Sequence, residues 1–219
     1  MINNNKVSVE ETDKLYLNRV WNCYLLNTIG NSWDTQKFNS NGIDTVNEMW
    51  KYLNMFFSIN GHKAQYQIDV ENNNRKEISF FQEGTYPNWD VFKTLRICNN
   101  LNELKIYCKN EHCEFILFTL LSLFGESFRE NANDEECDES YIQKICGIRI
   151  CPYKNPSIRL WLMDFTPKML GLLLDNLKFL WDKLYKNIPF KYNVRQLVHN
   201  KNFDTHQKVK TVKPMHRCA

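Results

Sequence analysis

The stretch Gly84-Thr85-Tyr86-Pro87-Asn88-Trp89-Asp90 sets a tryptophan beside a carboxylate in a segment rich in turn-forming residues. A second tryptophan, Trp33, follows a similar run of Gly, Asn and Ser at 30–32. We therefore expect both indoles to lie in loops. Two converging indoles can clamp a flat ring, most favourably a cationic one, while Asp90 accepts hydrogen bonds from its N–H edge. The alternative is that each indole folds back onto the core, because tryptophan is usually mostly buried.

Length and composition favour one globular domain. The chain has 219 residues, of which 43% are hydrophobic and 14% aromatic, enough for a sizeable core. We expect a disordered segment at 1–14, a domain at 15–200 and a flexible basic tail at 201–219. The formal charge of +3 is uneven, because 186–219 carries eight basic residues against one acid. That basic run either meets phosphates or is simply solvated.

Several classes of protein are disfavoured. The N-terminus lacks the apolar stretch of a signal peptide, and the longest apolar run, 115–124, is too short to span a bilayer. We expect a cytoplasmic, possibly nuclear location without a membrane partner. The eight cysteines show no Cys-x-x-Cys spacing and are interpreted as reduced thiols. Cys108, His112 and Cys113 lack a second ligand pair, so the sequence predicts no metal and no cofactor.

Local signals predict three helices. Thr45 and Glu48 match a capping box that begins the first helix. The second spans 111–124 and ends at Gly125. Thr166 and Pro167 supply the N-cap and first residue of the third, whose apolar stripe includes Trp181. Strand-like patterns occur at 15–26, 64–70, 77–82, 102–108, 142–151 and 157–165. The order indicates an α+β fold with the helices on one face of the sheet.

The loop Gly84-x-x-Pro87-x-Trp89-Asp90 resembles the Gly-x-x-Pro-x-Trp-Glu segment of the translation initiation factor 4E family, the eukaryotic mRNA cap-binding proteins. The resemblance covers most of 17–200. It implies a single curved antiparallel sheet with three helices on its convex face and the cap on the concave face. The other blocks that resemble the family, in order, are Trp21, Trp33, Thr45-Val46-x-x-x-Trp50, Leu120-Leu121-x-Leu123-x-Gly125-Glu126-Ser127-Phe128, Cys146-Gly147 and Ile158-x-x-Trp161.

By this resemblance, Trp33 and Trp89 would sandwich 7-methylguanine, whose positive charge strengthens its attraction to indole faces. Asp90 would accept the guanine N1–H and N2–H bonds, and Trp161 would touch the N7 methyl group. Asp90 stands where the family usually has Glu, so the carboxylate is one methylene shorter and the loop must come closer.

The family's pair of basic residues for the cap phosphates is not clearly reproduced. Strand alternation suggests a replacement, because Arg159 shares a sheet face with Trp161. A hairpin of 145–153 with 157–165 would put Arg149 opposite Trp161 on that face. Both arginines either meet phosphates or are merely solvated. The remaining candidates are Lys154 in the intervening loop and Lys191, His199 and Lys201 towards the C-terminus.

A second surface concerns protein partners. Val46 and Trp50 share one face of the first helix, and Leu117 matches the family's third contact there. The resemblance implies a helical Tyr-x-x-x-x-Leu-hydrophobe peptide from an initiation factor 4G-like scaffold or an inhibitory binding protein. The alternative is that all three residues simply pack inward.

The leading hypothesis is a non-catalytic binder of capped mRNA that recruits it for translation initiation. One alternative is a cap-binding repressor or paralogue without productive scaffold binding. Another is an enzyme acting on nucleotides or thiols. Its support is thin, because the sequence shows no nucleophile elbow, P-loop or metal-ligand spacing.

Overall fold

The computed structural model describes residues 15–29, 32–38, 41–60, 63–66, 75–128, 141–152 and 156–199. Within these ranges, eight strands form one antiparallel sheet: β1 (Tyr16–Ile29), β2 (Ser32–Lys37), β3 (Ile43–Thr45), β6 (Arg75–Gln82), β7 (Asn100–Tyr107), β8 (Ile145–Cys151), β9 (Ser157–Met163) and β10 (Tyr192–His199). The order across the sheet is β10-β7-β9-β8-β6-β1-β2, and β3 pairs with β1. A separate hairpin joins β4 (Phe57–Asn60) to β5 (Lys63–Tyr66).

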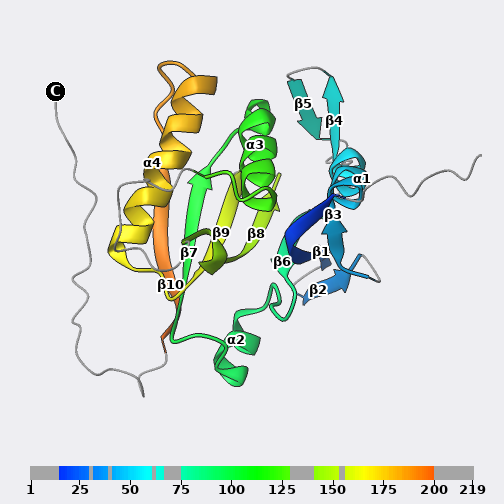
Figure 1. Cartoon of the computed structure of the whole chain (residues 1–219), viewed down its shortest axis with the longest axis vertical. Coiled ribbons are helices and arrows are strands. Elements are labelled where there is room, and N and C mark those ends of the chain that lie inside the picture. The colour runs from blue at the N-terminus through cyan, green and yellow to red at the C-terminus, as the bar shows by residue number, and fades with distance from the viewer. Residues whose placement is uncertain are drawn as a thin grey trace, which may run out of the picture.

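Three longer helices pack against one face of this sheet, which we call the helix face: α1 (Val46–Phe56), α3 (Cys113–Phe124) and α4 (Pro167–Leu184) (Figure 1). A short helix, α2 (Trp89–Leu95), lies apart from them at the lower end of the sheet in Figure 1. Single 3-10 turns occur at Asn110–His112 and Tyr141–Lys144. The predicted α+β class, with three helices packed on an antiparallel sheet, is confirmed.

Local capping explains where two of the helices begin. The Thr45 hydroxyl accepts the Glu48 amide at 3.3 Å, so α1 starts at the predicted place. The Glu48 carboxylate accepts from the Asp44 amide at 3.3 Å rather than from that of Thr45. Thr166 likewise caps α4 by accepting the Met169 amide at 3.2 Å. These hydrogen bonds satisfy donors that a helix leaves unpaired at its start.

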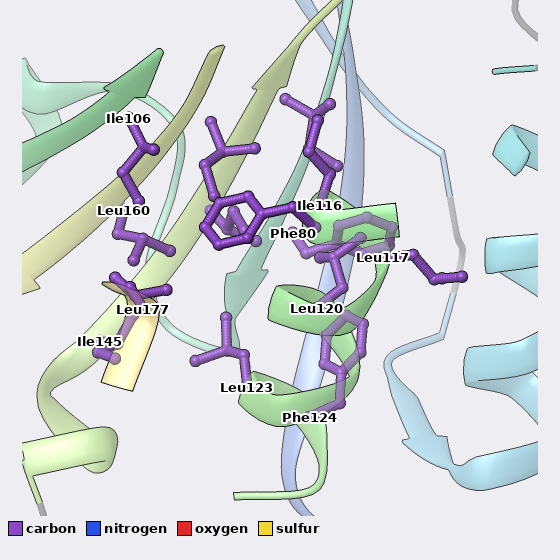
Figure 2. Packing of buried hydrophobic residues seen from close by; sticks show 14 of the residues in the cluster. Phe80, Ile106, Ile116, Leu117, Leu120, Leu123, Phe124, Ile145, Leu160 and Leu177 are labelled. Carbon is purple, nitrogen blue, oxygen red and sulfur yellow. The ribbon is translucent and has the colours of Figure 1, made fainter. Parts of the chain in front are cut away.

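The helix face holds the larger hydrophobic cluster (Figure 2). Phe80 of β6 lies near its centre, with ring centroids 6.2 Å from Phe56 of α1 and 5.3 Å from Phe124 of α3. Leu177 of α4 closes the cluster beside Ile145 and Leu160 of the sheet. No helix among the described residues is long and apolar enough to cross a membrane.

Alternate residues of the same strands face the other way and form what we call the open face. A smaller cluster is buried there: Tyr24, Leu26, Phe81, Phe92, Cys98, Leu101, Cys146, Trp161 and Val198. Phe92 belongs to α2, so this short helix covers part of the open face. The open face is therefore partly apolar and partly accessible.

Some expectations are corrected. Trp33 lies within β2 and Trp89 is the first residue of α2, so the prediction that both lie in loops is wrong. The helix predicted from 111 starts at Cys113, after a 3-10 turn. Strand β10 and helix α2 were not expected. The segments 1–14 and 201–219, Lys154 and Lys201 lie outside the described residues, so the domain limits stay a prediction.

Candidate ligand site on the open face

Trp89 and Asp90 form the accessible part of the site. The Asn88 side chain accepts the Asp90 amide at 3.0 Å and caps α2, which fixes where both residues emerge. Half of the Trp89 side chain is exposed (50%), and Asp90 is exposed as well. Trp89 is therefore not a lid on the core, and its indole is accessible for stacking beside an accessible carboxylate.

The loop before α2 turns back over the open face. Gly84 has a φ of +81°, a left-handed conformation that glycine adopts readily. The Thr85 hydroxyl then makes contacts of 2.7 Å with the Gln82 carbonyl and 3.2 Å with the Cys146 carbonyl. One residue on, the Tyr86 ring lies 6.4 Å from that of Tyr24 in β1. The segment that carries Trp89 is thus fixed against β1, β6 and β8.

The backbone of Trp33 approaches the same part of β1. Its strand partner is Thr28, four residues beyond Tyr24, a separation of about 13 Å along the strand. The Trp33 side chain lies outside the described part of the chain. Convergence of the two indoles therefore stays a prediction, and the topology brings the segments that carry them to neighbouring parts of the sheet.

Trp161 is enclosed rather than presented. Only 2% of its surface is exposed. Its ring meets Phe81 at 5.0 Å and Phe92 at 5.6 Å, both edge to face. Its Nε1 has no hydrogen-bond partner among the described residues. Trp161 was expected to touch a methyl group of the ligand. In this structure, however, the protein's own side chains already cover its ring.

A row of basic residues crosses the open face. The strand pairings align Lys37, Tyr24, Ser79, Arg149, Arg159, Lys105 and Asn193 across seven strands. Arg149, Arg159 and Lys105 are consecutive in this row, and we call them the basic row. Arg149 lies opposite Arg159, and Trp161 lies opposite Gly147, so the predicted direct pairing is displaced by two residues. The register of β8 against β9 therefore differs by two residues from the one assumed. The side chains of Arg149 and Trp161 still share the open face, because the Arg149 guanidinium lies over the Trp161 ring at 6.0 Å from its centroid.

Two buried carboxylates partly neutralise this row. Glu77 pairs with Arg149 at 2.5 Å, and both side chains are at least nine-tenths buried. Glu103 accepts from Arg195 at 2.8 Å, and its other oxygen lies 4.0 Å from Arg159. Arg149 is thus committed to an internal ion pair. Arg159, whose side chain is 22% exposed, and Lys105 are better placed to meet an anion.

The other basic candidates are less well placed. Lys191 is exposed just before β10, and its carbonyl accepts the Tyr107 amide at 3.0 Å. His199 ends β10, and its side chain lies outside the described part. Sequence reasoning missed Lys105 and Arg195, because only the pairing of β7 with β9 and β10 shows that they share a face with Arg159.

The predicted peptide surface on the helix side is accessible only in part. Trp50 is 37% exposed, Val46 is half-buried, and Leu117 is 6% exposed within the helix-face cluster. Leu15 and Tyr16, both largely exposed, lie beside α1, because the Val46 amide donates to the Leu15 carbonyl at 2.9 Å. The accessible apolar patch is therefore centred on Trp50 and the start of β1.

The described thiols are buried, and His112 packs among aromatic rings. Burial raises the pKa of Cys108 and Cys151 to about 12 and of Cys113 to about 11, whereas nucleophilic cysteines have lowered values. The His112 ring meets Trp181 edge to face and lies tilted against Tyr185, and its Nδ1 accepts the Lys109 amide at 3.1 Å. Among the described residues, no group of three or more His, Cys, Asp or Glu is placed to hold a metal ion.

Comparison with known proteins gives a result only at the level of structure. No protein-family model matches the sequence, and no curated protein matches it. Solved structures match along most of the chain. Schistosome eIF4E complexed with m7GpppA and 4E-BP shows 15% identity and a TM-score of 0.59, covering 93% of this chain and 99% of that one.

Two nematode proteins match similarly. C. elegans eIF4E-3, in complex with the 4E-binding protein Mextli and a cap analog, has 18% identity and a TM-score of 0.58, covering 82% of this chain and 92% of that one. Ascaris suum eIF4E-3 with m7G cap has 18% identity and a TM-score of 0.56, covering 92% and 96%. At this level of identity the comparisons show the fold: the chain folds like eIF4E.

Proposed function

We propose that this protein binds the 7-methylguanosine cap of mRNA on its open face, without catalysis, and brings capped mRNA to the translation initiation machinery. The observation that carries the proposal is the half-exposed Trp89 beside the exposed Asp90. They lie on a fold that several cap-bound proteins share. The raised thiol pKa values argue against a thiol enzyme.

Stacking supplies selectivity in this proposal. Trp89 covers one face of the methylated base, Trp33 covers the other, and Asp90 accepts from the N–H edge. A cation over an indole gains about 0.5–2 kcal/mol, depending on how well the site excludes water. GTP carries an uncharged base, so it lacks this term and binds more weakly. The clamp thus selects for methylation at N7.

Two residues of the basic row, Arg159 and Lys105, hold the phosphates. Like charges on directly opposed strand positions destabilise a sheet, and Arg149, Arg159 and Lys105 are three such charges in succession. Glu77 and Glu103 compensate two of them, so the three together keep a net positive charge. A phosphate chain beside Arg159 and Lys105 would relieve the remaining repulsion. Lys191 lies just before β10, and Lys154 and Lys201 remain candidates from the sequence alone.

A helical peptide from a scaffold or inhibitory 4E-binding protein docks on the apolar patch of Trp50, Val46, Leu15 and Tyr16. Leu117 is buried in the helix-face cluster against which Val46 packs. One observation favours the second candidate, a cap binder without productive scaffold binding. The β4–β5 hairpin lies against α3, with the Ala64 amide donating to Glu114 at 3.4 Å, and Leu117 is nearly covered. Capture on cap resin with and without a scaffold peptide separates the two.

Two exposed tryptophans provide a matched test. Trp89→Ala should weaken 7-methyl-GTP binding by about 1–3 kcal/mol, the usual loss of one stacking face, or roughly 5–150-fold. Trp50→Ala removes an indole of similar exposure on the other side of the sheet and should leave affinity within about twofold. Equal loss in both variants would refute the stacking assignment.

The phosphate assignment is tested separately by salt dependence. Arg159→Ala and Lys105→Ala should each flatten the dependence of 7-methyl-GTP affinity on salt concentration, because each removes one phosphate contact. An unchanged slope in both variants would remove the basic row from the site and leave the stacking assignment intact.

A further inference from the structure

The chain uses Trp161 in a way that the resemblance does not imply. We propose that Trp161 and Phe81 form a socket into which Phe92 docks, which holds α2 in place and thereby positions Trp89 and Asp90, with Phe92 as the positioning residue. This inference rests on the proposed function of Trp89. It deepens that function by assigning the contact that holds Trp89 in place.

Helix α2 needs such an anchor. It has seven residues, and isolated helices shorter than about 12–15 residues are marginal in water. Phe92 is the only buried side chain of this helix, all of whose residues are described. Trp89 lies three residues earlier on the same side of the helix. Without Phe92 in its socket, no other buried side chain would hold the helix that presents Trp89.

The socket is built from rings that pack edge to face. Trp161 meets Phe92 at 5.6 Å with an interplanar angle of 62°, and Phe81 at 5.0 Å with an angle of 87°. Phe92 and Phe81 are fully buried. Such pairs contribute beyond their buried area, because the positive ring edge meets the negative ring face. Val198 of β10 is buried in the same cluster.

Hydrogen bonds between side chains and the backbone hold the two ends of the segment. Upstream, the Thr85 hydroxyl lies 3.2 Å from the Cys146 carbonyl. Downstream, the Asn100 amide donates to Asp164 at 2.7 Å. At the end of α2 the Ile97 amide donates to the Phe92 carbonyl at 3.2 Å, and Arg96 adopts a left-handed φ of 51°. Pro87 and Cys98 are also buried nearer the two ends of the segment, and Phe92 is the buried contact within α2 itself.

Preorganisation gives this contact its effect on binding. A stacking side chain held in its bound position loses less conformational freedom when ligand arrives. Removing Phe92 should therefore weaken binding even though Phe92 itself does not touch the ligand. The effect should pass through Trp89, so that the two residues are coupled.

The test compares two buried phenylalanines. Phe92→Ala is matched by Phe115→Ala, because Phe115 is equally buried and meets Trp181 edge to face at 5.0 Å on the helix face. At a temperature where both variants are folded, Phe92→Ala should lower 7-methyl-GTP affinity by about tenfold and Phe115→Ala by no more than about twofold. Phe92→Leu, which refills the socket, should recover most of the affinity.

A double-mutant cycle distinguishes positioning from general destabilisation. In the Phe115→Ala background, Trp89→Ala should lower 7-methyl-GTP affinity by as much as it does in the wild-type chain. In the Phe92→Ala background, it should lower affinity by at most about threefold. A full Trp89 effect in the Phe92→Ala background would overturn the proposal. The proposal would also be overturned if Trp161→Phe lowered affinity as much as Trp89→Ala without speeding hydrogen exchange in α2, because Trp161 would then contact the ligand directly.

Amide hydrogen exchange gives a readout that needs no ligand. In Phe92→Ala, the amides of 91–95 should exchange at least about tenfold faster, while β7 and β9 stay protected. Unchanged exchange in α2 would overturn the proposal. If the wild-type protein shows no preference for 7-methyl-GTP over GTP, the cap-binding function fails, and the exchange result still decides whether Phe92 holds α2.

Discussion

Gly147 offers a stringent test of how the open face is packed. It lies between Phe81 and Trp161 in the strand register. A methyl group added at Gly147 would come within 2.5 Å of Phe81 Cδ1 and 2.7 Å of Cζ, and nearer still to Cε1. Ordinary contacts begin near 3.4 Å. Phe81 is fully buried against Trp161, so its ring has little room to retreat. Gly147→Ala should therefore destabilise the fold by about 1–3 kcal/mol.

The same substitution elsewhere should have the opposite sign. Gly171 lies within α4, and an added methyl group there meets nothing within 4 Å. Gly171→Ala should stabilise the protein by about 0.5–1 kcal/mol, because alanine loses less backbone entropy in a helix. Urea unfolding of both variants measures the difference, expected at about 1.5–4 kcal/mol. A Gly147→Ala variant as stable as wild type would refute the packing described for Phe81 and Trp161.

Two further predictions concern charge. Glu77→Ala should lower the free energy of unfolding by about 3–5 kcal/mol, because it leaves Arg149 buried without its acid. Asp182→Ala breaks an exposed ion pair of the same 2.5 Å length and should lower it by at most about 1 kcal/mol. Comparable losses in urea unfolding would refute the role of burial. Burial lowers the pKa of His112 below its usual 6.5, so the unfolded chain binds a proton at this site more tightly than the folded chain does. The contribution of His112 to the free energy of unfolding should therefore be fully present above about pH 6.5 and be lost as the pH falls below it. His112→Gln keeps an acceptor for the Lys109 amide and should flatten this dependence in urea unfolding between about pH 7.5 and 5; an identical slope would contradict the assignment.

The elements that could be predicted from the sequence are those with local causes. Thr45 and Thr166 cap their helices through side chains three residues from the amides they accept. The apolar stripe of α4 likewise depends only on spacing within the helix. By contrast, α2 has seven residues and depends on a socket formed by distant strands. β10 is an edge strand within a basic stretch of sequence that resembles a solvated tail.

The site was only partly predictable for the same reason. The exposure of Trp89 followed from its turn-rich surroundings, since half of its surface is accessible. The enclosure of Trp161 did not follow, because Phe92 is 69 residues away in the sequence and meets it only through packing. The alignment of Lys105 with Arg159 required the register of β7 against β9. Alternation along a strand shows which residues share a face, but only the pairing of distant strands shows which of them are neighbours.

The central claim is that Trp89 belongs to a clamp for a positively charged base. The most direct measurement is the ratio of the dissociation constants for GTP and 7-methyl-GTP, determined by isothermal titration on the wild-type chain. The two ligands differ by one methyl group and the charge that it brings to the ring. Cation–indole attraction predicts that 7-methyl-GTP binds more tightly than GTP by about 2–30-fold for each indole that covers the base. A ratio near one would contradict the account.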